Sequence, residues 1–386
     1  MTRAYDITIF GATGFTGGMT AEYLARHAPP GLRWAIAGRS AAKLAAVKAR
    51  LVAIDAIHQG VGCVQASLDA ADSLQQMAAR TRVLVTTVGP FIEYGEPVVR
   101  ACVEQDTDYI DSTGEPNFMQ LLLARYAGPA AERKLRLVPS CGFDSIPADL
   151  GALFTVQQLP RDQPIQLSGY LSVQAQFSGG TEQSAIMSWA PPRERLQAPA
   201  APKPANGRRV RLLTSKIERR PELERWTAPL PTIDGSVVLR SAASLERYGP
   251  DFSYTHNAVH GSLGTLIAAI CVFGTLAFLA RFAALRGLLL KLVKKSGEGP
   301  SQEQMNKSWF KLRFIAECAG QRLQTEVSGG DPGYVETSKM LAESALCLAF
   351  EREQLPLRFG VLTPAEAMGE RLLERLQAAG LHFRVL

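Results

Sequence analysis

The chain is predicted to be an α/β protein in which an N-terminal, doubly wound parallel sheet precedes a second α+β domain that carries a hydrophobic insertion. Two features of the sequence predict this. Short apolar runs alternate with stretches of helical periodicity from residue 5 to residue 158, and a glycine-rich segment separates the first run from the first helical stretch. The length of 386 residues is sufficient for two or three domains, each with its own core.

The alternating elements follow one another in a regular order. Strands are expected at residues 5–10, 32–37, 61–66, 83–88, 108–111 and 135–140. Helices are expected at residues 16–27, 40–53, 70–80, 95–105, 116–133 and 146–158. Strand–helix units of this length favour a parallel sheet, because each helix provides the crossover that a parallel connection requires.

The composition excludes several classes of protein. Hydrophobic residues make up 46% of the chain and charged residues 20%, which is ordinary globular usage, so disordered, collagen-like and coiled-coil chains are excluded. The 6 cysteines stand far apart without a C-x-x-C pair, so neither a metal site nor a disulfide framework is predicted. The first strand runs directly into glycine-rich sequence without a signal-peptide pattern, so we expect the chain to begin in the cytosol.

The positive charge is localised. The formal net charge is +6, and residues 193–225 alone hold ten Lys/Arg against four Glu. A second basic cluster spans residues 281–295. Such clusters suit nucleic acid or an anionic membrane surface. Because no helix-turn-helix, zinc-finger or RNP-like motif accompanies them, a nucleic-acid partner is not predicted.

The glycine-rich segment has the spacing of a dinucleotide-binding loop. Gly11, Gly14 and Gly17 follow the first strand at G-x-x-G-x-x-G spacing. The first glycine permits a tight turn, the second a close approach of a pyrophosphate to the backbone, and the third close packing of helix on strand. We therefore predict a Rossmann domain here. The residues of the loop expected to contact the cofactor are Gly11, Thr13, Gly14, Phe15, Thr16 and Gly17.

The end of the second strand indicates which dinucleotide is bound. An NAD site would offer Asp or Glu to the ribose hydroxyls about twenty residues after the glycine loop. This chain has Arg39 followed by Ser40. A guanidinium suits a 2′-phosphate, so NADP(H) is the predicted cofactor. The alternative is that Arg39 only ends a loop.

Several longer motifs resemble one known family. They are GATGFTG (11–17), AGRS (37–40), VGPFIEYGEPVVRAC (88–102), DYIDSTGEPNFM (108–119), CGFDSIPADLG (141–151), SGGT (178–181), GGDPGY (329–334) and GVLTPAEAMG (360–369). The chain resembles the saccharopine dehydrogenase-like oxidoreductases, and within them the enoyl reductase branch. That branch includes the mycobacterial trans-acting enoyl reductases and the saccharopine dehydrogenase-like proteins of animal lipid droplets.

The resemblance implies a domain division. It implies an NADP-binding domain at 1–147, an α+β substrate domain at 148–340, and C-terminal helices at 341–386 that pack back on the first domain. The substrate domain would carry a basic, lid-like insertion at 190–235, where proline, alanine and charge dominate. It would also carry the hydrophobic segment 261–293.

The resemblance also adds cofactor contacts after the third and fourth strands. The loop of Gly89, Pro90 and Phe91 is implied to pass beside the nicotinamide, which agrees with ligand binding at the carboxyl ends of parallel strands. A plain turn is the alternative. Asp69 is expected either to contact the adenine or to cap the helix at 70–80.

The catalytic residues are sought at the ends of strands, where a reduction requires a proton donor beside the reacting carbon or carbonyl. The candidates are Tyr94, Cys141, Asp144 and Ser145. Asp144 and Ser145 have an alternative role as helix caps, and Cys141 as a small core residue. Glu115, which precedes Pro116, is a further candidate with the same alternative of capping. His256 and His260 are spaced i, i+4 but lack a third metal ligand, so we interpret the pair as coincidence.

Residues 261–280 form an uncharged, apolar stretch long enough to span a membrane. A single span would separate SGGT (178–181) from GGDPGY (329–334), which the resemblance places in one domain. We therefore expect a peripheral or monotopic protein on the cytoplasmic face of a membrane or on a lipid droplet, with 282–293 as a return limb. The alternative is a cytoplasmic protein with the stretch buried at a homodimer interface.

Three functions remain open from the sequence. The preferred one is an NADPH-dependent enoyl or keto reductase that acts on a lipid or polyketide-type acyl substrate, because an apolar segment accompanies the cofactor loop. The second is a saccharopine-type amino-acid dehydrogenase, whose dicarboxylate substrate would need several convergent Arg or Lys. The third is a non-enzymatic NADP-binding membrane or lipid-droplet adaptor, since no compelling catalytic pair stands out in the sequence.

Overall fold

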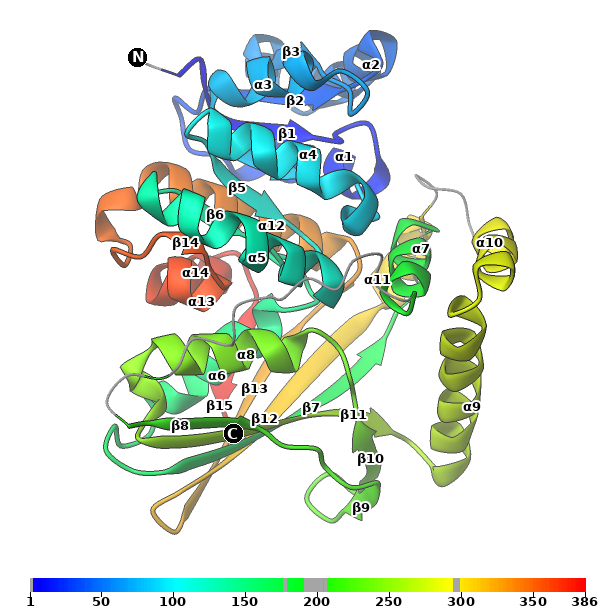
Figure 1. Ribbon diagram of the computed structural model, residues 1–386, viewed down its shortest axis with the longest axis vertical. Coiled ribbons are helices and arrows are strands. Elements are labelled where there is room, and N and C mark those ends of the chain that lie inside the picture. Colours follow the sequence, from blue (N-terminus) through cyan, green and yellow to red (C-terminus); the bar gives the residue numbers. More distant parts are fainter. Residues whose placement is uncertain (1–2, 176–178, 191–203, 205–206, 294–298) are drawn as a thin grey trace.

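The computed structural model describes residues 3–175, 179–190, 204, 207–293 and 299–386. Two sheets form the two ends of the molecule (Figure 1), with helices packed on and between them. The first is a seven-stranded sheet of order β14-β6-β5-β4-β1-β2-β3, and the second an eight-stranded sheet of order β15-β13-β12-β7-β11-β10-β9 with β8 paired to β11. The predicted α/β class is confirmed.

The first sheet is a parallel Rossmann sheet. Every pairing in it is parallel. Its strands are β1 (Tyr5–Phe10), β2 (Trp34–Gly38), β3 (Gly62–Gln65), β4 (Thr81–Thr86), β5 (Asp108–Asp111), β6 (Arg136–Val138) and β14 (Gly360–Val361). The helices that connect the first six strands are α1 (Phe15–His27), α2 (Ala41–Ile54), α3 (Ala71–Ala79), α4 (Phe91–Glu104) and α5 (Pro116–Glu132). The sequence predicted all of these elements except β14, and the largest shift is in α4, which begins at Phe91 rather than at residue 95.

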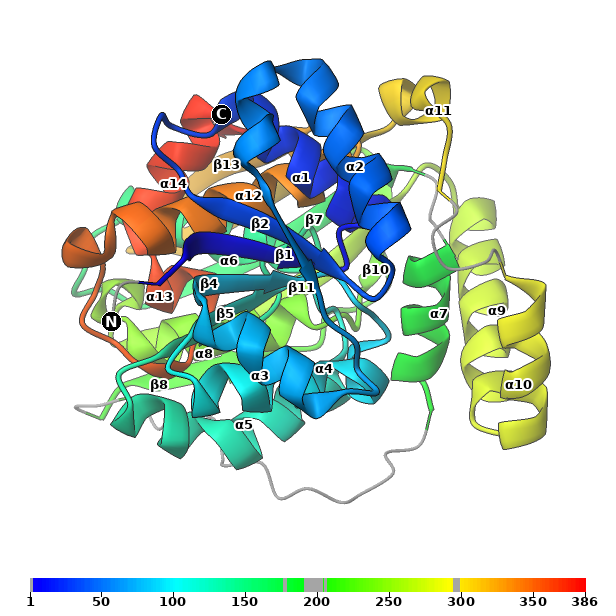
Figure 2. The same ribbon diagram turned by 90° about the horizontal axis from the view of Figure 1, so that it is seen from above.

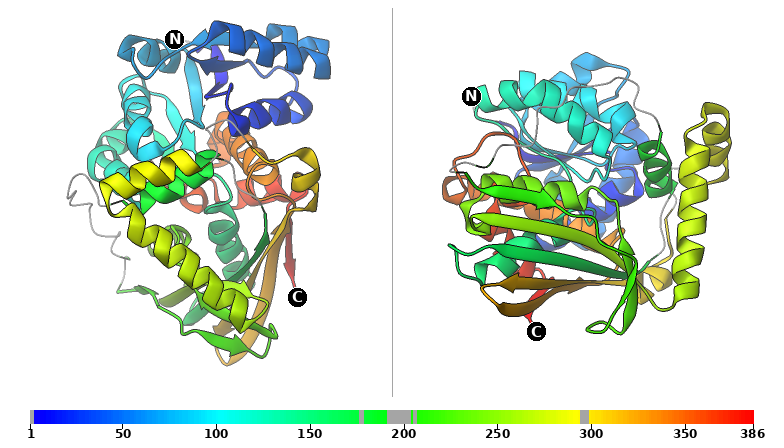
Figure 3. Two further views of the ribbon diagram at one scale, coloured as in Figure 1. Left: turned by 90° about the vertical axis from the view of Figure 1, so that its right-hand side faces the viewer. Right: turned by 60° about the horizontal axis from the view of Figure 1, so that its bottom comes forward.

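The second sheet is mixed and is covered on its inner face by helices. Its strands are β7 (Ile165–Gln174), β8 (Arg209–Leu212), β9 (Glu218–Arg220), β10 (Arg225–Pro229), β11 (Asp251–His260), β12 (Trp309–Cys318), β13 (Gln321–Gly329) and β15 (His382–Val385). Helices α6 (Ile146–Gln157) and α8 (Asp234–Ser244) pack on this sheet and on each other. Figure 3 shows the broad sheet with these helices between it and the first domain.

Part of the expected lid at 190–235 belongs to the second sheet instead. β8 pairs with β11, and β9 and β10 extend the sheet beyond it. The described residues 207–229 therefore contribute three strands to this sheet, and the expectation of a lid is wrong for them. Residues 191–203 and 205–206 lie outside the described residues.

The C-terminal segment joins both domains. Helix α12 (Val335–Phe350) is buried along nearly its whole length and packs on α1, β1, β4 and β5. Strand β14 then adds to the edge of the first sheet, and β15 adds to the second. Helices α13 (Pro364–Ala367) and α14 (Gly369–Ala378) lie between these strands in the chain. The return toward the first domain thus begins at residue 335 rather than at 341, and it includes strands as well as helices.

Two apolar helices stand at the side of the molecule. They are α9 (Leu263–Ala280) and α10 (Ala283–Leu292), and Figure 2 shows them beside α7 (Gly179–Ser188). Helix α9 also contacts β10 and β11 of the second sheet. In the part of the chain that the structure describes, α9 alone is long and apolar enough to cross a membrane by length and composition, with a mean hydropathy of 2.3 and only 11% of it buried. The short helix α11 (Gln302–Lys307) leads from this unit back to β12.

Candidate cofactor and active site

The glycine loop connects β1 to α1 at the carboxyl end of the first strand. Gly11 has φ +90°, a conformation that favours glycine, and a Cβ there would lie 2.8 Å from both Thr87 Oγ1 and Val88 Cγ2. A Cβ on Gly17 would collide with the Gly11 carbonyl oxygen. These two glycines are therefore required by the turn and by the close approach of α1 to β1, as the motif predicts.

Gly14 has a different reason to be glycine. The backbone of Gly14 is extended, with φ −84° and ψ 174°, and the residue is exposed to solvent. A Cβ built on Gly14 would approach only the Gly11 carbonyl oxygen, at 3.2 Å. Gly14 is the N-cap of α1 without a side-chain cap, and the first turn holds no acidic residue. The unpaired N–H groups and the positive end of the helix dipole are therefore available to an anion, which fits a dinucleotide pyrophosphate.

The other predicted cofactor residues lie at neighbouring strand ends. Arg39 is exposed directly after β2, and within the described chain its guanidinium has no hydrogen bond or ion pair. The Ser40 hydroxyl caps α2 by accepting from Lys43 N. Thr13 Oγ1 lies near the end of β2, 3.6 Å from a Cβ built on Gly38. Asp69 is exposed after β3, but the N-cap of α3 is Ala70 and carries no side-chain cap, so the capping alternative for Asp69 is wrong.

The loops after β4 and β5 are joined by Glu115. Its carboxylate accepts from the N–H groups of Phe91 at 2.8 Å and Ile92 at 2.9 Å, so it caps α4 rather than its own helix α5. Burial raises the pKa of Glu115, while the two N–H groups and the Ser184 hydroxyl of α7 oppose this rise. Ser184 Oγ also lies 3.4 Å from a Cβ built on Gly89. Helix α7 of the second domain is therefore seated on the loop of Gly89 and Pro90.

Asp144 lies at the junction of the two domains. It follows β6 and packs on the loop after β5, where a Cβ built on Gly114 would lie 3.1 Å from Asp144 Cγ. Water reaches Asp144, yet protein surrounds it closely enough that desolvation, with the nearby charge of Asp234, raises the pKa of its carboxyl to about 7. An accessible carboxyl that stays partly protonated at neutral pH is chemically suited to donate a proton.

Comparison with known proteins agrees with this geometry. The family model described as the saccharopine dehydrogenase NADP binding domain matches residues 7–136. A candidate trans-acting enoyl reductase of Mycobacterium tuberculosis is 38% identical over 98% of this chain and 97% of its own length. A saccharopine dehydrogenase-like oxidoreductase of Mus musculus is 32% identical over 100% of this chain and 98% of its own. The chain belongs to the saccharopine dehydrogenase-like oxidoreductase family.

A solved structure shows the same fold over the whole chain. Saccharopine dehydrogenase (L-Glu forming) from Saccharomyces cerevisiae matches with a TM-score of 0.58 at 11% identity, and the match covers 99% of this chain and 100% of that one. Membership of the family and its NADP binding domain make this chain an NADP-dependent oxidoreductase. The exposed Arg39 and the uncapped start of α1 are the features of this structure that fit NADP.

The remaining catalytic candidates differ sharply in accessibility. Cys141 is fully buried and its thiol donates to the Val138 carbonyl, so its burial favours the alternative of a core residue. Ser145 is also fully buried, and its hydroxyl donates to the Asp144 carbonyl rather than capping α6. The capping alternative for Asp144 and Ser145 is therefore wrong. Tyr94 is 41% exposed on the first turns of α4.

Two residues of the second domain were not among the predicted sites. Asp234 begins α8, and its charge acts on Asp144. His256 lies on β11 with Nε2 3.7 Å from Asp234 Oδ2. Nothing in the sequence marks the two residues as a pair, because their contact depends on how α8 packs against β11.

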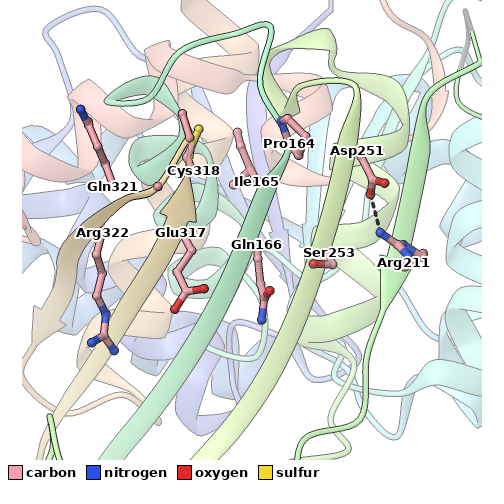
Figure 4. Close-up of a pocket in the computed structure, with 12 residues that line it drawn as sticks. Pro164, Ile165, Gln166, Arg211, Asp251, Ser253, Glu317, Cys318, Gln321 and Arg322 are labelled. Carbon is pink, nitrogen blue, oxygen red and sulfur yellow. Dashed lines mark hydrogen bonds and ion pairs between the residues drawn. The ribbon is translucent and has the colours of Figure 1, made fainter.

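Two surface hollows lie away from this junction. The first, of about 490 Å³, is on the outer face of the second sheet (Figure 4), where Gln166, Ser253 and Glu317 lie side by side on neighbouring strands. The ion pair between Arg211 and Asp251 lies at its edge. The second, of about 900 Å³, lies between α6 and α14. Neither hollow is lined by the glycine loop or by Asp144, so neither belongs to the candidate site.

Arg39→Asp is expected to weaken NADPH binding far more than NADH binding. The change replaces a charge-assisted contact to the 2′-phosphate with repulsion, worth at most about 3 kcal/mol. Binding of both cofactors by isothermal titration calorimetry measures the difference. Arg100→Asp is the matched control, because Arg100 is an exposed arginine near the far end of α4. Equal affinities for the two cofactors in the unmutated protein would refute the role of Arg39.

Proposed function

We propose that the protein is a reductase that uses NADPH to reduce an enoyl or keto group of a lipid or polyketide-type acyl substrate at a membrane surface. The observation that carries the proposal is the water-accessible Asp144 carboxyl beside the strand ends of the Rossmann sheet. Relatives that are named trans-acting enoyl reductase support the choice of reaction. The apolar helices α9 and α10 support the choice of substrate.

The chemistry requires a hydride and a proton. The hydride, which carries both electrons, is what a bound NADPH supplies, and it adds to one atom of the double bond. The other atom of the double bond takes a proton. We assign that proton to the Asp144 carboxyl, which becomes a carboxylate and is protonated again from water. Glu115 holds the loop of Gly89 and Pro90 at the start of α4, where the implied nicotinamide contact lies.

The membrane surface is proposed from the exposure of α9 and α10. Large apolar side chains on both helices face solvent, among them Ile267, Val272, Phe278 and Leu288, each about half exposed or more. Exposed apolar patches of this extent mark interaction sites. The basic residues Arg281 and Lys291 of the same unit suit anionic headgroups.

Helix α7 connects this apolar unit to the cofactor loop. Helix α7 packs on α9 and α10. Trp189, the residue after α7, contacts Phe273 of α9 in an edge-to-face arrangement, with the ring centroids 6.4 Å apart. Ser184 of the same helix contacts Glu115 and Gly89. A hydrophobic substrate that leaves a lipid surface at α9 and α10 would therefore reach the cofactor loop along α7. This arrangement favours a lipid over a free amino acid as the substrate.

The test is the change of NADPH absorbance in a stopped-flow instrument, with the full-length protein and one substrate class at a time. We expect loss of NADPH with enoyl or keto lipids presented in vesicles. With NADP⁺ and saccharopine, a secondary amine that can only be oxidised, we expect no formation of NADPH. Turnover of saccharopine alone would show the amino-acid dehydrogenase instead. No turnover with either class, together with intact NADPH binding, would favour the adaptor.

Full-length protein is expected to sediment with anionic vesicles and to resist release by salt, because burial of apolar surface is insensitive to screening. Detergent should release it. Replacing residues 261–293 with a Gly/Ser linker should give a soluble protein that still binds NADPH. Ile267→Glu with Val272→Glu should weaken sedimentation, whereas Leu357→Glu, at an 87% exposed apolar position elsewhere, should not. A soluble full-length protein that elutes as a dimer would instead support the homodimer interface.

A further inference from the structure

The chain enters helix α12 through a turn that is held by its own side chain. This turn carries the GGDPGY motif (329–334), to which the proposed function gives no role. Asp331 is buried, and its Oδ1 accepts from the N–H groups of Tyr334 at 2.7 Å and Val335 at 3.3 Å. The Asp331 carbonyl accepts from the Glu336 N–H at 2.9 Å. The start of α12 is therefore a preorganised part of the structure.

Two side chains at the start of α12 reach the first residues of α1. The Tyr334 ring is fully buried and meets the Phe15 ring edge to face, with the ring centroids 4.8 Å apart. Ser338, one helical turn further along and also buried, donates from Oγ to the Thr16 carbonyl at 3.3 Å. Phe15 and Thr16 are the first two residues of α1. Both contacts therefore act at the helix end where the pyrophosphate is expected to bind.

The Phe15 ring is also in contact with Gly299. A Cβ built on Gly299 would lie 2.6 Å from Phe15 Cε1 and Cζ and 2.7 Å from Cε2. Real Cβ atoms do not approach other atoms so closely, so the ring lies directly on the backbone of this glycine. Gly299 precedes α11, whereas Tyr334 precedes α12. Two separate parts of the chain, both far from the first domain in the sequence, thus hold the same ring.

These contacts act on the backbone groups that the cofactor needs. The N–H of Gly18 donates to the Gly14 carbonyl at 3.0 Å, which is the first i→i−4 bond of α1. The N–H groups of Phe15, Thr16 and Gly17 come before this bond and point out of the end of the helix. They can hold a pyrophosphate only while the first turn keeps its orientation. Since Gly14 provides no side-chain cap, the contacts on Phe15 and Thr16 supply this constraint from outside the loop.

We propose that Tyr334 and Ser338 are positioning residues for the cofactor, which hold the first turn of α1 in the orientation that binds the pyrophosphate of NADP(H). Gly299 takes part because its lack of a side chain leaves room for the Phe15 ring. The pyrophosphate site is thus completed by residues outside the matched family domain at 7–136. The inference concerns cofactor binding alone, so it does not rest on the proposed substrate or on the proposed proton donor.

The test is calorimetric titration of the full-length protein with NADPH, with a thermal melt of each variant to show that it is folded. Ser338→Ala removes the hydroxyl that donates to Thr16 and should weaken NADPH binding about fivefold, or about 1 kcal/mol. Ser344→Ala is the matched control, because Ser344 is a fully buried serine further along the same helix. This control should leave NADPH affinity unchanged.

Two further substitutions test the contacts on the Phe15 ring. Tyr334→Leu removes the edge-to-face partner and should weaken NADPH binding about tenfold, or about 1.4 kcal/mol, whereas Tyr334→Phe keeps the ring and should preserve binding. Gly299→Ala should also weaken binding, because the added methyl group would displace the Phe15 ring. Gly128→Ala is its control, at an exposed position of α5 with nothing within 4 Å of the Cβ.

A ligand without a pyrophosphate distinguishes positioning from general damage to the first domain. Adenosine 2′-monophosphate carries the 2′-phosphate that Arg39 is predicted to bind, but it has no pyrophosphate. Its affinity, measured by competition with NADPH, should be the same in the unmutated protein and in Ser338→Ala, Tyr334→Leu and Gly299→Ala. A loss that is confined to NADPH would be the expected result.

Two results would overturn the inference: unchanged NADPH affinity in the folded variants, or equal losses for NADPH and adenosine 2′-monophosphate. Ser338→Ala and Gly299→Ala decide the question if Tyr334→Leu does not fold. Neither titration needs a substrate, so the outcome is independent of the proposed reaction. The expected losses in a protein without reductase activity would reject the reductase but keep the positioning residues. Turnover together with unchanged NADPH affinity in the variants would do the reverse.

Discussion

Gly14→Val is expected to weaken NADPH binding by at least about a hundredfold, or about 2.8 kcal/mol, while the protein remains folded. The backbone of Gly14 is extended, which valine adopts readily, and only the Gly11 carbonyl oxygen lies close to the added Cβ, at 3.2 Å. The rest of the side chain would project into the space before α1, where the pyrophosphate must approach the N–H groups of the helix. Calorimetry with NADPH and a thermal melt measure the two effects.

The controls separate a cofactor effect from a folding effect. Gly60→Val places the same side chain at an exposed site with nothing within 4 Å of the Cβ, and should leave binding unchanged. Gly17→Val should instead unfold or strongly destabilise the protein, because its Cβ collides with the Gly11 carbonyl. Unchanged NADPH binding in a folded Gly14→Val protein would mean that the loop does not hold the pyrophosphate.

The Rossmann part of the fold was predictable because its signals are local. The first six strands of the first sheet, β1 to β6, are short runs next to helical stretches, so neighbouring residues alone identify them, whereas β14 is only two residues long and was not predicted. The glycine loop is local as well, and its sequence already contains the reasons for Gly11 and Gly17. The choice of Arg39 as a cofactor residue used only the expected distance along the chain from this loop.

The second sheet was harder to predict, because its edge strands depend on distant partners. β8 has the sequence RVRL, whose alternation covers only four residues, and β9 has the sequence ERR, which contains no apolar residue. They form strands because β11 and β10 offer them free edges. Composition alone therefore suggested a lid.

Caps were also misassigned for a physical reason. Glu115 and Ser145 both stand directly before a helix, which is where a cap for that helix is expected. In the structure, Glu115 caps α4, the preceding helix in the chain, and Ser145 bonds to its own loop. Asp234 and His256 were not predicted as a pair, because they are far apart in the sequence. Only the packing of α8 on β11 brings their side chains to within 3.7 Å of each other.

Asp144→Asn is expected to lower kcat for NADPH oxidation by about 10²- to 10⁴-fold, because the amide has the shape of the acid but cannot donate its proton. NADPH affinity should not change, since the glycine loop and Arg39 are distant in the chain and intact. In the unmutated protein, activity should fall as the pH rises through about 7, where the carboxyl loses its proton. The residual activity of the variant should lack this dependence. A variant with full activity would remove Asp144 from the mechanism.

The same substitution should have the opposite effect on stability, which distinguishes a functional carboxyl from a structural one. The pKa of Asp144 is raised from 3.8 to about 7 on folding, so the folded state binds its proton more tightly than the unfolded state does. The free energy of unfolding therefore decreases as the pH rises from about 4 to about 7. Asparagine does not titrate, so this decrease is absent in Asp144→Asn. The variant should have a higher melting temperature than the unmutated protein at pH 8 and a similar one at pH 4. Loss of activity with a gain in stability at pH 8 is expected of a group kept for proton donation at a cost to the fold. If the variant melts lower at both pH values, Asp144 is structural, and the lost activity reflects damage to the junction.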